Sequence, residues 1–167
     1  MSEKKLYTVK GITAHIVNSK IGKGTVIWSF VNIYDSEIGE NCKIASFVEI
    51  GGAKIGSNCK IEAMVFIPIG VTIGNNVFIG PGVKFANDKH PQVVDDDKWE
   101  WTLGKIEVGN NVAIGIGSII LPNVKIGDHS FIAADSLVTS DIPPHSFAMG
   151  RPAHVVSSQV LKELNVL

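Results

Sequence analysis

The chain has 167 residues, of which 45% are hydrophobic, and its formal net charge at pH 7 is −1. This length and composition predict one domain, 1–167, with a full core, and a near-neutral charge without a basic cluster excludes an electrostatic surface for nucleic acid. The charged start at 1–7 and the lack of a long apolar run predict neither a secretory leader nor a membrane span, so we expect a cytoplasmic protein.

A six-residue repeat dominates most of the chain. Isoleucines recur every five or six residues at Ile21, Ile27, Ile33, Ile38, Ile44, Ile50, Ile55, Ile61, Ile67, Ile73 and Ile79. The pattern stops after Phe85 and returns at Val108, Ile114, Ile120, Ile126, Ile132 and Val138. An amphipathic helix places apolar residues about every 3.6 positions and a strand every second position, so neither explains a period of six. The repeat predicts a coil of short strands with three sides.

Two further positions follow the same period. Four residues after each repeat position stands a small or β-branched residue, which predicts a second inward stripe: Thr25, Val31, Cys42, Val48, Cys59, Val65, Val71, Val77, Val83, Val112, Ser118, Val124, Ser130 and Ser136. Three residues after it stand Gly24, Asn41, Asn58, Gly70, Asn76, Gly82, Asn111, Gly117, Asn123 and His129. These residue types tolerate a left-handed backbone, so we expect them at the corners.

Ile-Gly and Val-Gly pairs mark the length of one full coil. They begin at Ile21, Ile38, Ile55, Ile73, Val108 and Ile126, so a coil takes 17 or 18 residues. Parallel hydrogen bonds space the layers about 4.8 Å apart, and roughly seven coils then make a column about 30 to 35 Å tall. We expect the repeats over about 12–85 and 106–142.

The two cysteines, Cys42 and Cys59, are 17 residues apart and occupy the same position of adjacent coils. Small free cysteines are commonly buried, and neither has a histidine nearby in the sequence. The spacing therefore predicts core packing rather than a disulfide or a nucleophile.

The interruption, 86–105, is the segment expected to carry the chemistry, because a loop of about twenty residues is uncommon in a compact domain and is often functional. It begins Asn-Asp-Lys-His-Pro-Gln at 87–92 and continues with an acidic run, 95–97, and two tryptophans, Trp99 and Trp101. Exposed aromatic residues on a loop need a partner surface, either another subunit or a sugar ring. After the repeats, we expect a cap over 143–167 with a short helix near its end.

The chain resembles the hexapeptide-repeat acyltransferase family, through three repeats and its ending: Ile-Gly-Ser-Asn-Cys-Lys (55–60), Ile-Gly-Asn-Asn-Val-Phe (73–78), Val-Gly-Asn-Asn-Val-Ala (108–113), Val-Thr-Ser-Asp-Ile-Pro-Pro (138–144) and Gly-Arg-Pro-Ala (150–153). The resemblance implies an all-β fold, a left-handed parallel β-helix. It also implies a homotrimer with acetyl-CoA bound between subunits. Nothing in the periodicity itself indicates handedness or assembly.

The loop is similar to two branches of that family. In its O-acetyltransferases a His-Pro pair supplies the general base, which His90-Pro91 matches. In its nucleotide-linked amino-sugar N-acetyltransferases the loop resembles Asn-Asp-x-x-Pro-Arg, which Asn87, Asp88 and Pro91 match, with Gln92 in place of the arginine. Histidine suits deprotonation of a hydroxyl, whereas an amine needs chiefly positioning and a carboxylate. The arginine would grip a diphosphate, and the sequence leaves open which residue replaces it.

We favour N-acetylation of a nucleotide-linked amino sugar, with Asn87, Asp88 and His90 as catalytic candidates. The alternatives are O-acetylation with His90 as base and a non-catalytic β-helix. For coenzyme A, the resemblance implies backbone groups bared by small residues and a basic residue near the ending, which gives Gly115, Gly117, Ala133, Ala134 and Arg151. The five histidines show no close ligand pair, so no metal is expected.

Overall fold

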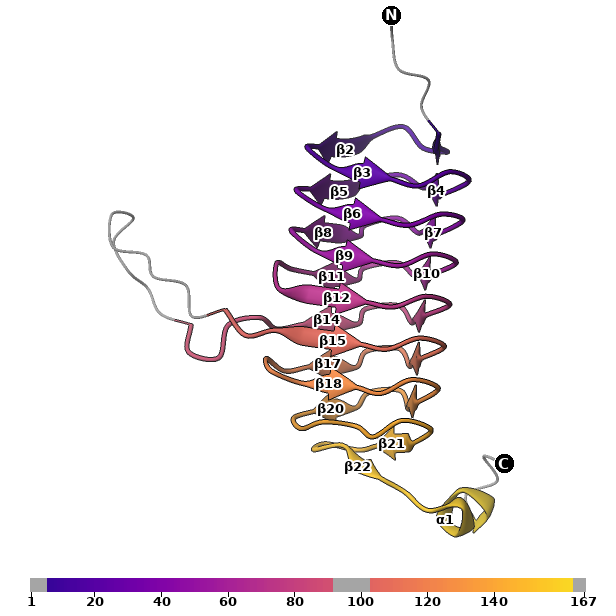
Figure 1. Ribbon diagram of the computed structural model, residues 1–167, viewed down its shortest axis with the longest axis vertical. Coiled ribbons are helices and arrows are strands. Elements are labelled where there is room, and N and C mark those ends of the chain that lie inside the picture. The colour runs from indigo at the N-terminus through magenta and orange to yellow at the C-terminus, as the bar shows by residue number, and fades with distance from the viewer. Residues whose placement is uncertain (1–5, 92–102, 164–167) are drawn as a thin grey trace, which may run out of the picture.

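The computed structural model describes residues 6–91 and 103–163. The chain forms a three-sided column of about seven coils, and each side is a parallel β-sheet (Figure 1). Each layer runs from sheet C to sheet A and then to sheet B while the chain descends, and the coil is left-handed (Figure 1). The expected left-handed β-helix is confirmed.

The three sheets are built from short strands. Sheet A contains β1 (Thr8–Val9), β4 (Val26–Ile27), β7 (Lys43–Ile44), β10 (Lys60–Ile61), β13 (Phe78–Ile79), β16 (Ala113–Ile114), β19 (Phe131–Ile132), β21 (Phe147–Met149) and β22 (His154–Val155). Sheet B contains β2 (Ala14–Val17), β5 (Val31–Tyr34), β8 (Glu49–Gly51), β11 (Phe66–Ile67), β14 (Lys84–Phe85), β17 (Ile119–Ile120) and β20 (Leu137–Val138). Sheet C contains β3 (Lys20–Ile21), β6 (Glu37–Ile38), β9 (Lys54–Ile55), β12 (Val71–Ile73), β15 (Ile106–Val108) and β18 (Lys125–Ile126).

Both predicted apolar stripes fill the core. In sheet A, Ile27, Ile44 and Ile61 lie in register on neighbouring strands and are fully buried. The second stripe, which includes Thr25 and Cys42, is buried as well. Burying one such isoleucine stabilises the fold by about 1.5 to 3 kcal/mol, and the stack repeats in every layer. The first layer begins earlier than expected, since β1 pairs with β4 through Thr8 and Val26.

Three corners connect the sheets of each layer: the A–B corner, the B–C corner and the C–A corner. All ten predicted corner residues have a positive φ, which confirms the turns. The A–B corner also holds three bulky residues with positive φ that the residue-type rule misses: Phe30 (58°), Phe47 (62°) and Met64 (61°). A left-handed backbone costs a residue with a Cβ about 1 to 2 kcal/mol.

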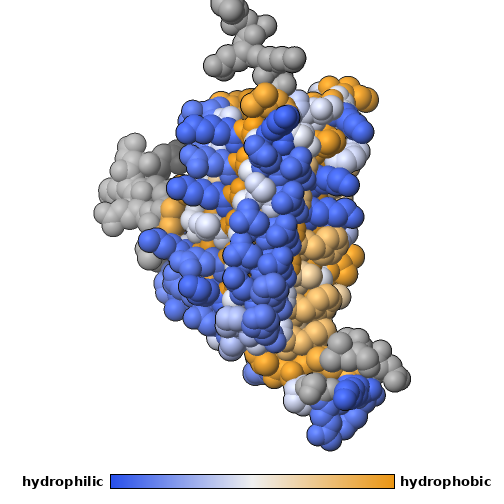
Figure 2. Space-filling view, turned by 45° about the vertical axis from the view of Figure 1, so that its right-hand side comes forward, coloured by the Kyte–Doolittle hydropathy of each residue, from blue (hydrophilic) through white to orange (hydrophobic). Residues whose placement is uncertain are grey.

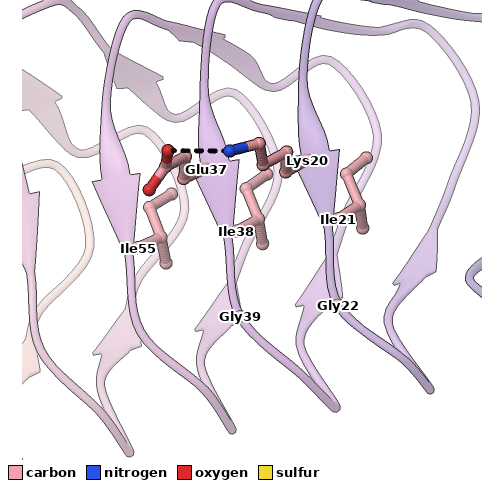
Figure 3. Close-up of a pocket in the computed structure, with 7 residues that line it drawn as sticks. All are labelled: Lys20, Ile21, Gly22, Glu37, Ile38, Gly39 and Ile55. Atoms are coloured by element: carbon pink, nitrogen blue, oxygen red, sulfur yellow. Dashed lines mark ion pairs between the residues drawn. The ribbon is translucent and has the colours of Figure 1, made fainter.

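Sheet C has a polar outer face, whose outward residues are Lys20, Glu37, Lys54, Thr72, Glu107 and Lys125. Lys20 pairs with Glu37 at 3.7 Å over a hollow of about 390 Å³ (Figure 3). Gly22 and Gly39 lie just below, and a Cβ on Gly22 would come within 2.5 Å of the Gly39 carbonyl carbon in the next layer. This hollow offers an exposed ion pair and backbone, without a nucleophile or a free charge.

The cysteines pack in the core as predicted. Cys42 and Cys59 are free and buried, and their Sγ atoms lie 3.2 Å from the carbonyl oxygens of Gly56 and Gly74, to which the thiols donate. The Cys42 thiol beside it, together with burial, raises the pKa of Cys59. Cys59 therefore stays protonated and inert.

The lower end of the column is closed by a strand that runs in the opposite direction. Strand β22 pairs antiparallel with β21, through Val155 and Ala148, and covers the last edge of sheet A. Helix α1 (Ser158–Glu163) follows, and Leu161 on it is buried. The expected C-terminal helix is present, but the last edge of sheet A is covered by β22.

Candidate functional site

The loop stem leaves the B–C corner between β14 and β15 and projects away from the column (Figure 1). Its two arms are held together by an antiparallel bridge between Asp88 and Leu103 and by a hydrogen bond from Gly104 N to Asn87 O, 2.8 Å. The Asn87 side chain donates through Nδ2 to Ile69 O at 3.1 Å, which ties the stem to the preceding coil. The base of the loop is therefore fixed by the column.

Of the three catalytic candidates, two take part in shaping the stem. Asp88 Oδ1 accepts a hydrogen bond from the His90 backbone N at 2.8 Å, an Asx-turn that directs the chain after it. Asn87 and Asp88 are partly buried, whereas His90 is exposed. Gln92, Trp99, Trp101 and the acidic run 95–97 lie outside the described residues.

A hollow of about 240 Å³ adjoins the stem. It is lined by Tyr34, Asp35, Gly51, Gly52, Phe66, Pro68, Ile69 and Asn87. The Tyr34 ring lies across Gly51, where a Cβ would come within 2.2 Å of the ring, and its hydroxyl lies 3.4 Å from Glu49 Oε1. Partial burial and the Glu49 carboxylate raise the pKa of Tyr34, so its hydroxyl stays a donor at neutral pH.

The predicted coenzyme A residues lie together at another edge, the lower part of the A–B corner. Gly115 is required by stacking, because a Cβ there would come within 2.4 Å of Ala134 N in the next layer. Gly117 differs: its φ is +72° and a Cβ would meet nothing within 4 Å. Gly82, one layer above, has the same open surroundings. Ala133 and Ala134 continue this bare strip, while the same corner in the upper layers carries Phe30, Phe47 and Met64.

Arg151 lies at the foot of this strip. Its Nη1 donates to Asp135 Oδ1 at 2.6 Å, and both side chains are largely exposed. Asp135 occupies the corner position directly below Gly117, since Asp135 N donates to Ile116 O. The predicted cation is thus at the expected end of the strip, with its charge partly balanced by a carboxylate.

A second hollow, the sheet A hollow, lies beside the upper part of the A–B corner and has a volume of about 390 Å³. It is lined by Trp28, Lys43, Ala45, Ser46, Lys60, Ile61, Glu62 and Ala63. Trp28 stands one layer above Ala45 and Glu62 one layer below it, so the small alanine leaves a gap between two larger side chains. Sequence reasoning missed this site, although comparing residues 17 positions apart would have revealed it.

The outer face of sheet A changes character down the column. Below the hollow, Phe78, Phe131 and Phe147 are exposed or half-buried, and the rings of the last two stack at 4.9 Å. Figure 2 shows the contrast: hydrophilic side chains cover the left and centre of the molecule, and an apolar patch lies on the lower right.

The structure does not bring the two groups of predicted residues together within one chain. Gly82 lies at the A–B corner and Asn87 at the B–C corner, with β14 of sheet B between them. Asn87 is held on the B–C side by its bond to Ile69. The loop stem and the bare strip occupy different edges of the same column.

The described residues contain neither a metal-binding cluster nor a membrane-spanning helix. Within 6–91 and 103–163, no group of three or more His, Cys, Asp or Glu residues could hold a metal ion. In the same part of the chain, no helix is long and apolar enough to cross a membrane.

The repeats of this chain match a known protein family. The family described as "Bacterial transferase hexapeptide (six repeats)" matches residues 18–52, 35–69, 52–87 and 105–140, which is more than half of the chain. The chain belongs to the hexapeptide-repeat transferase family. Among solved structures, this hexapeptide-repeat transferase is similar to a galactoside acetyltransferase in complex with coenzyme A, with 35% identity, a TM-score of 0.62, and coverage of 77% of this chain and 68% of that one.

Two further relatives extend the comparison. A hexapeptide-repeat acetyltransferase from Vibrio cholerae, complexed with acetyl coenzyme A, has 27% identity and a TM-score of 0.63, with 74% of this chain and 70% of that one covered. The galactoside O-acetyltransferase of Escherichia coli is 46% identical over 87 residues, which are 52% of this chain and 43% of that protein. This hexapeptide-repeat transferase spans about two fifths of the length of the first curated relatives it matches.

Proposed function

We propose that this protein transfers an acetyl group from acetyl-CoA to a hydroxyl of a sugar acceptor, with His90 as general base. The observation that carries the proposal is the division of roles in the loop stem. One oxygen of Asp88 holds the turn and the Asn87 amide donates to Ile69, which leaves the exposed His90 imidazole as the candidate general base among the described stem residues. The relatives named galactoside O-acetyltransferases support a hydroxyl acceptor.

The reaction is a direct acyl transfer. The His90 imidazole takes the hydroxyl proton while the oxygen attacks the thioester carbonyl carbon, and a C–O bond forms. The C–S bond then breaks, the sulfur receives the proton from the imidazolium, and the products are an acetyl ester and the free thiol of coenzyme A. A positioned base contributes about 10² to 10⁴-fold to such a step.

The bare strip of the A–B corner is the proposed donor site. Large side chains are tolerated at this corner, as Phe47 and Met64 show, so the absence of side chains at Gly82 and Gly117 leaves room for an extended pantetheine arm. Gly115, Ala133 and Ala134 keep the neighbouring backbone accessible, and Arg151 would meet the nucleotide phosphates in exchange for Asp135.

A homotrimer completes the site in this proposal. Because the His90 stem and the donor strip occupy different corners, the base of one subunit would serve the strip of the next, a head-to-tail contact that closes after three copies. Phe30, Phe47 and Met64 are more than half exposed at strained corner positions, and a neighbouring subunit would cover them.

The second candidate function is N-acetylation of a nucleotide-linked amino sugar. It is favoured by the Asn87-Asp88 pair, since the second oxygen of Asp88 remains able to attract an ammonium group. In either case the donor is a cytoplasmic metabolite, so we place the reaction in the cytoplasm.

The deciding experiment is thiol release from acetyl-CoA by the purified protein with galactosides, amino sugars and nucleotide-linked amino sugars. Release with hydroxyl acceptors supports the proposal, and release confined to amino sugars replaces it with the second candidate. If the protein binds neither acetyl-CoA nor any acceptor, an enzymatic role is contradicted.

The shared site has its own test. Equal amounts of His90→Ala and Gly117→Trp proteins are unfolded together and refolded, and activity is measured at an acetyl-CoA concentration well below the wild-type KM, where each variant alone has at most about a tenth of the wild-type rate. Random mixing in a head-to-tail trimer pairs an intact stem with an intact strip in about a quarter of the sites, so about a quarter of wild-type activity should return. No recovery in mixed trimers would contradict a site between subunits.

A further inference from the structure

The sheet A hollow contains an unusual arrangement of charge. Lys43 and Lys60 lie directly opposite each other on β7 and β10, whereas the flanking positions of the same face, Val26 and Phe78, are uncharged. Like charges opposite one another on neighbouring strands are destabilising. Sheet C avoids this conflict by pairing opposite charges, as in the pair of Lys20 and Glu37. The lysine pair is therefore costly for the isolated column.

Within the hollow only part of this charge is balanced. Lys60 Nζ pairs with Glu62 Oε1 at 2.6 Å and lies 5.5 Å from the centre of the Phe78 ring. Among the described residues, the Lys43 ammonium has no carboxylate within ion-pair distance. The hollow therefore keeps one positive charge for an anion, with a second ammonium beside it.

The remaining walls suit a sugar attached to that anion. The half-buried Trp28 indole offers a flat apolar surface, and Ser46 and Glu62 offer hydrogen-bonding groups to hydroxyls. The volume of about 390 Å³ lies in the range of small-molecule sites. An ammonium group on the ligand would be repelled by the two lysines, so the charged end of the acceptor is an anion.

The hollow is also placed next to the proposed donor strip. Gly82 N donates to Ala63 O at 2.8 Å, so the first bare corner of the strip lies one layer below the floor of the hollow. An acceptor held there by its anionic end would extend toward the thioester. Binding energy from a remote group can orient the reacting hydroxyl in this way.

From these contacts we infer that the sheet A hollow binds the phosphate of a phosphorylated sugar acceptor between Lys43 and Lys60. The inference rests on the proposed function and specifies its substrate class, either a sugar monophosphate or a sugar joined to a nucleoside diphosphate. It also supplies the cations that Gln92 does not provide. Trp28 packs against the sugar ring, and Glu62 orients its hydroxyls.

The test compares acceptors that differ in phosphate alone: methyl galactoside, galactose 1-phosphate and UDP-galactose, with thiol release as the readout. We expect kcat/KM at least about 10-fold higher for a phosphorylated acceptor, since each charge-assisted hydrogen bond is strong. Preference for galactose 1-phosphate identifies a monophosphate substrate, and preference for UDP-galactose a nucleotide-linked one. Equal or better transfer to methyl galactoside would overturn the inference.

The lysines are tested by the double variant Lys43→Gln, Lys60→Gln. We expect the KM for the phosphorylated acceptor to rise at least about 10-fold, with kcat and the KM for acetyl-CoA little changed. Lys54→Gln, on sheet C, is the matched control and should behave as wild type. Both lysines of the pair are exposed, so the variant should fold. A rise in the KM for acetyl-CoA instead would assign the lysines to the donor phosphates and refute their role toward the acceptor.

Binding of UDP and of inorganic phosphate, measured by isothermal titration calorimetry, separates failure of the two proposals. If no acceptor releases thiol but UDP or phosphate binds wild-type protein and not the double variant, the anion site stands while the acetyl transfer fails. If thiol is released and neither probe binds, the anion site fails while the transferase stands.

Discussion

The A–B and B–C corners differ in what they offer to a ligand. The A–B corner has the bare strip around Gly117 and the hollow beside Trp28, where the described carboxylates, Glu62 and Asp135, are each paired with a cation. The B–C corner has the loop stem with His90, whose side chain is exposed and away from the strip. In the proposed mechanism each edge of one chain supplies half of an acyl-transfer site, so the proposal requires several copies to assemble.

The strongest test of this division is His90→Ala. With a hydroxyl acceptor we expect kcat to fall by about 10² to 10⁴-fold, because the base that removes the hydroxyl proton is lost. The rate should be measured by thiol release, with acetyl-CoA binding checked separately and unchanged. The control is His154→Ala on β22, far from the stem, which should keep wild-type activity. If His90→Ala lowered kcat only slightly, His90 would not be the general base and the B–C corner would have no role in the proposed acyl transfer.

Gly117→Trp tests the opposite edge. A Trp side chain would occupy the strip, so the KM for acetyl-CoA should rise at least about 10-fold, while strain at φ +72° costs about 1 to 2 kcal/mol of folding free energy. Asn41→Trp places the same side chain at a positive φ of 55° on the C–A corner and should leave the KM unchanged. Equal effects of the two variants would show that strain, and not obstruction, is responsible.

Phe47→Gly tests whether the upper part of the A–B corner contacts another subunit. Loss of the exposed ring should weaken association by about 10 to 100-fold in light scattering. The isolated column should keep its Tm, because relief of strain at φ 62° offsets loss of the 5.1 Å ring stack with Phe30. Val17→Ser, at an exposed apolar position at the far end of β2 from the A–B corner, should not change the mass. An unchanged mass for Phe47→Gly would contradict a contact at this corner.

The smallest effect is expected at the C–A corner, which holds none of the proposed site residues. The Asn110 backbone N–H, 2.8 Å from Asp128 Oδ1, and the Asn110 amide lower the pKa of Asp128 from 3.8. A depressed pKa stabilises the folded state above the unfolded pKa, and this is lost as pH falls through the folded value. Asp128→Asn should therefore lower Tm slightly at pH 6 to 7, and the difference should shrink as the pH falls below 3.8 toward the lower pKa of the folded state.

The control for this titration is Glu40→Gln, at a position without a side-chain hydrogen bond in the described structure. Its Tm difference from wild type should not depend on pH in the same interval. If Asp128→Asn behaved in the same way, Asp128 would not contribute to acid sensitivity.

The parts of the fold that follow from periodicity were predictable. Ile27, Ile44 and Ile61 share one register because the coil repeats at 17 residues, and corners at Asn41 and Asn58 follow from residue type. The corner positions of Phe30, Phe47 and Met64 were not predicted, because bulky residues are uncommon at a positive φ. Their conformation is imposed by the coil, which requires a corner wherever a layer turns.

The site was predictable only in pieces. The small residues around Gly117 and the proposed base His90 were inferred from motifs, and the structure places them at separate corners. The sheet A hollow depends on size differences between Trp28, Ala45 and Glu62, which meet only once the layers are stacked in register. The Arg151 and Asp135 pair likewise joins residues from different layers.

The glycine column of sheet C has a consequence for how such a chain can change length. A Cβ at Gly22, Gly39 or Gly56 would come within about 2.7 Å of the backbone of the next layer, so every layer must present the same bare position to its neighbour. Insertions within the strands are therefore admissible only as whole coils, whereas the B–C corner tolerates extra residues, as the coils of 17 or 18 residues and the inserted segment 86–105 show. An extra coil above β2 would lengthen the protein without cost to the site, whereas one between β10 and β13 would move the hollow about 4.8 Å from the donor strip. Whole coils can therefore be added above β2, whereas the number of coils between the sheet A hollow and the donor strip must be kept.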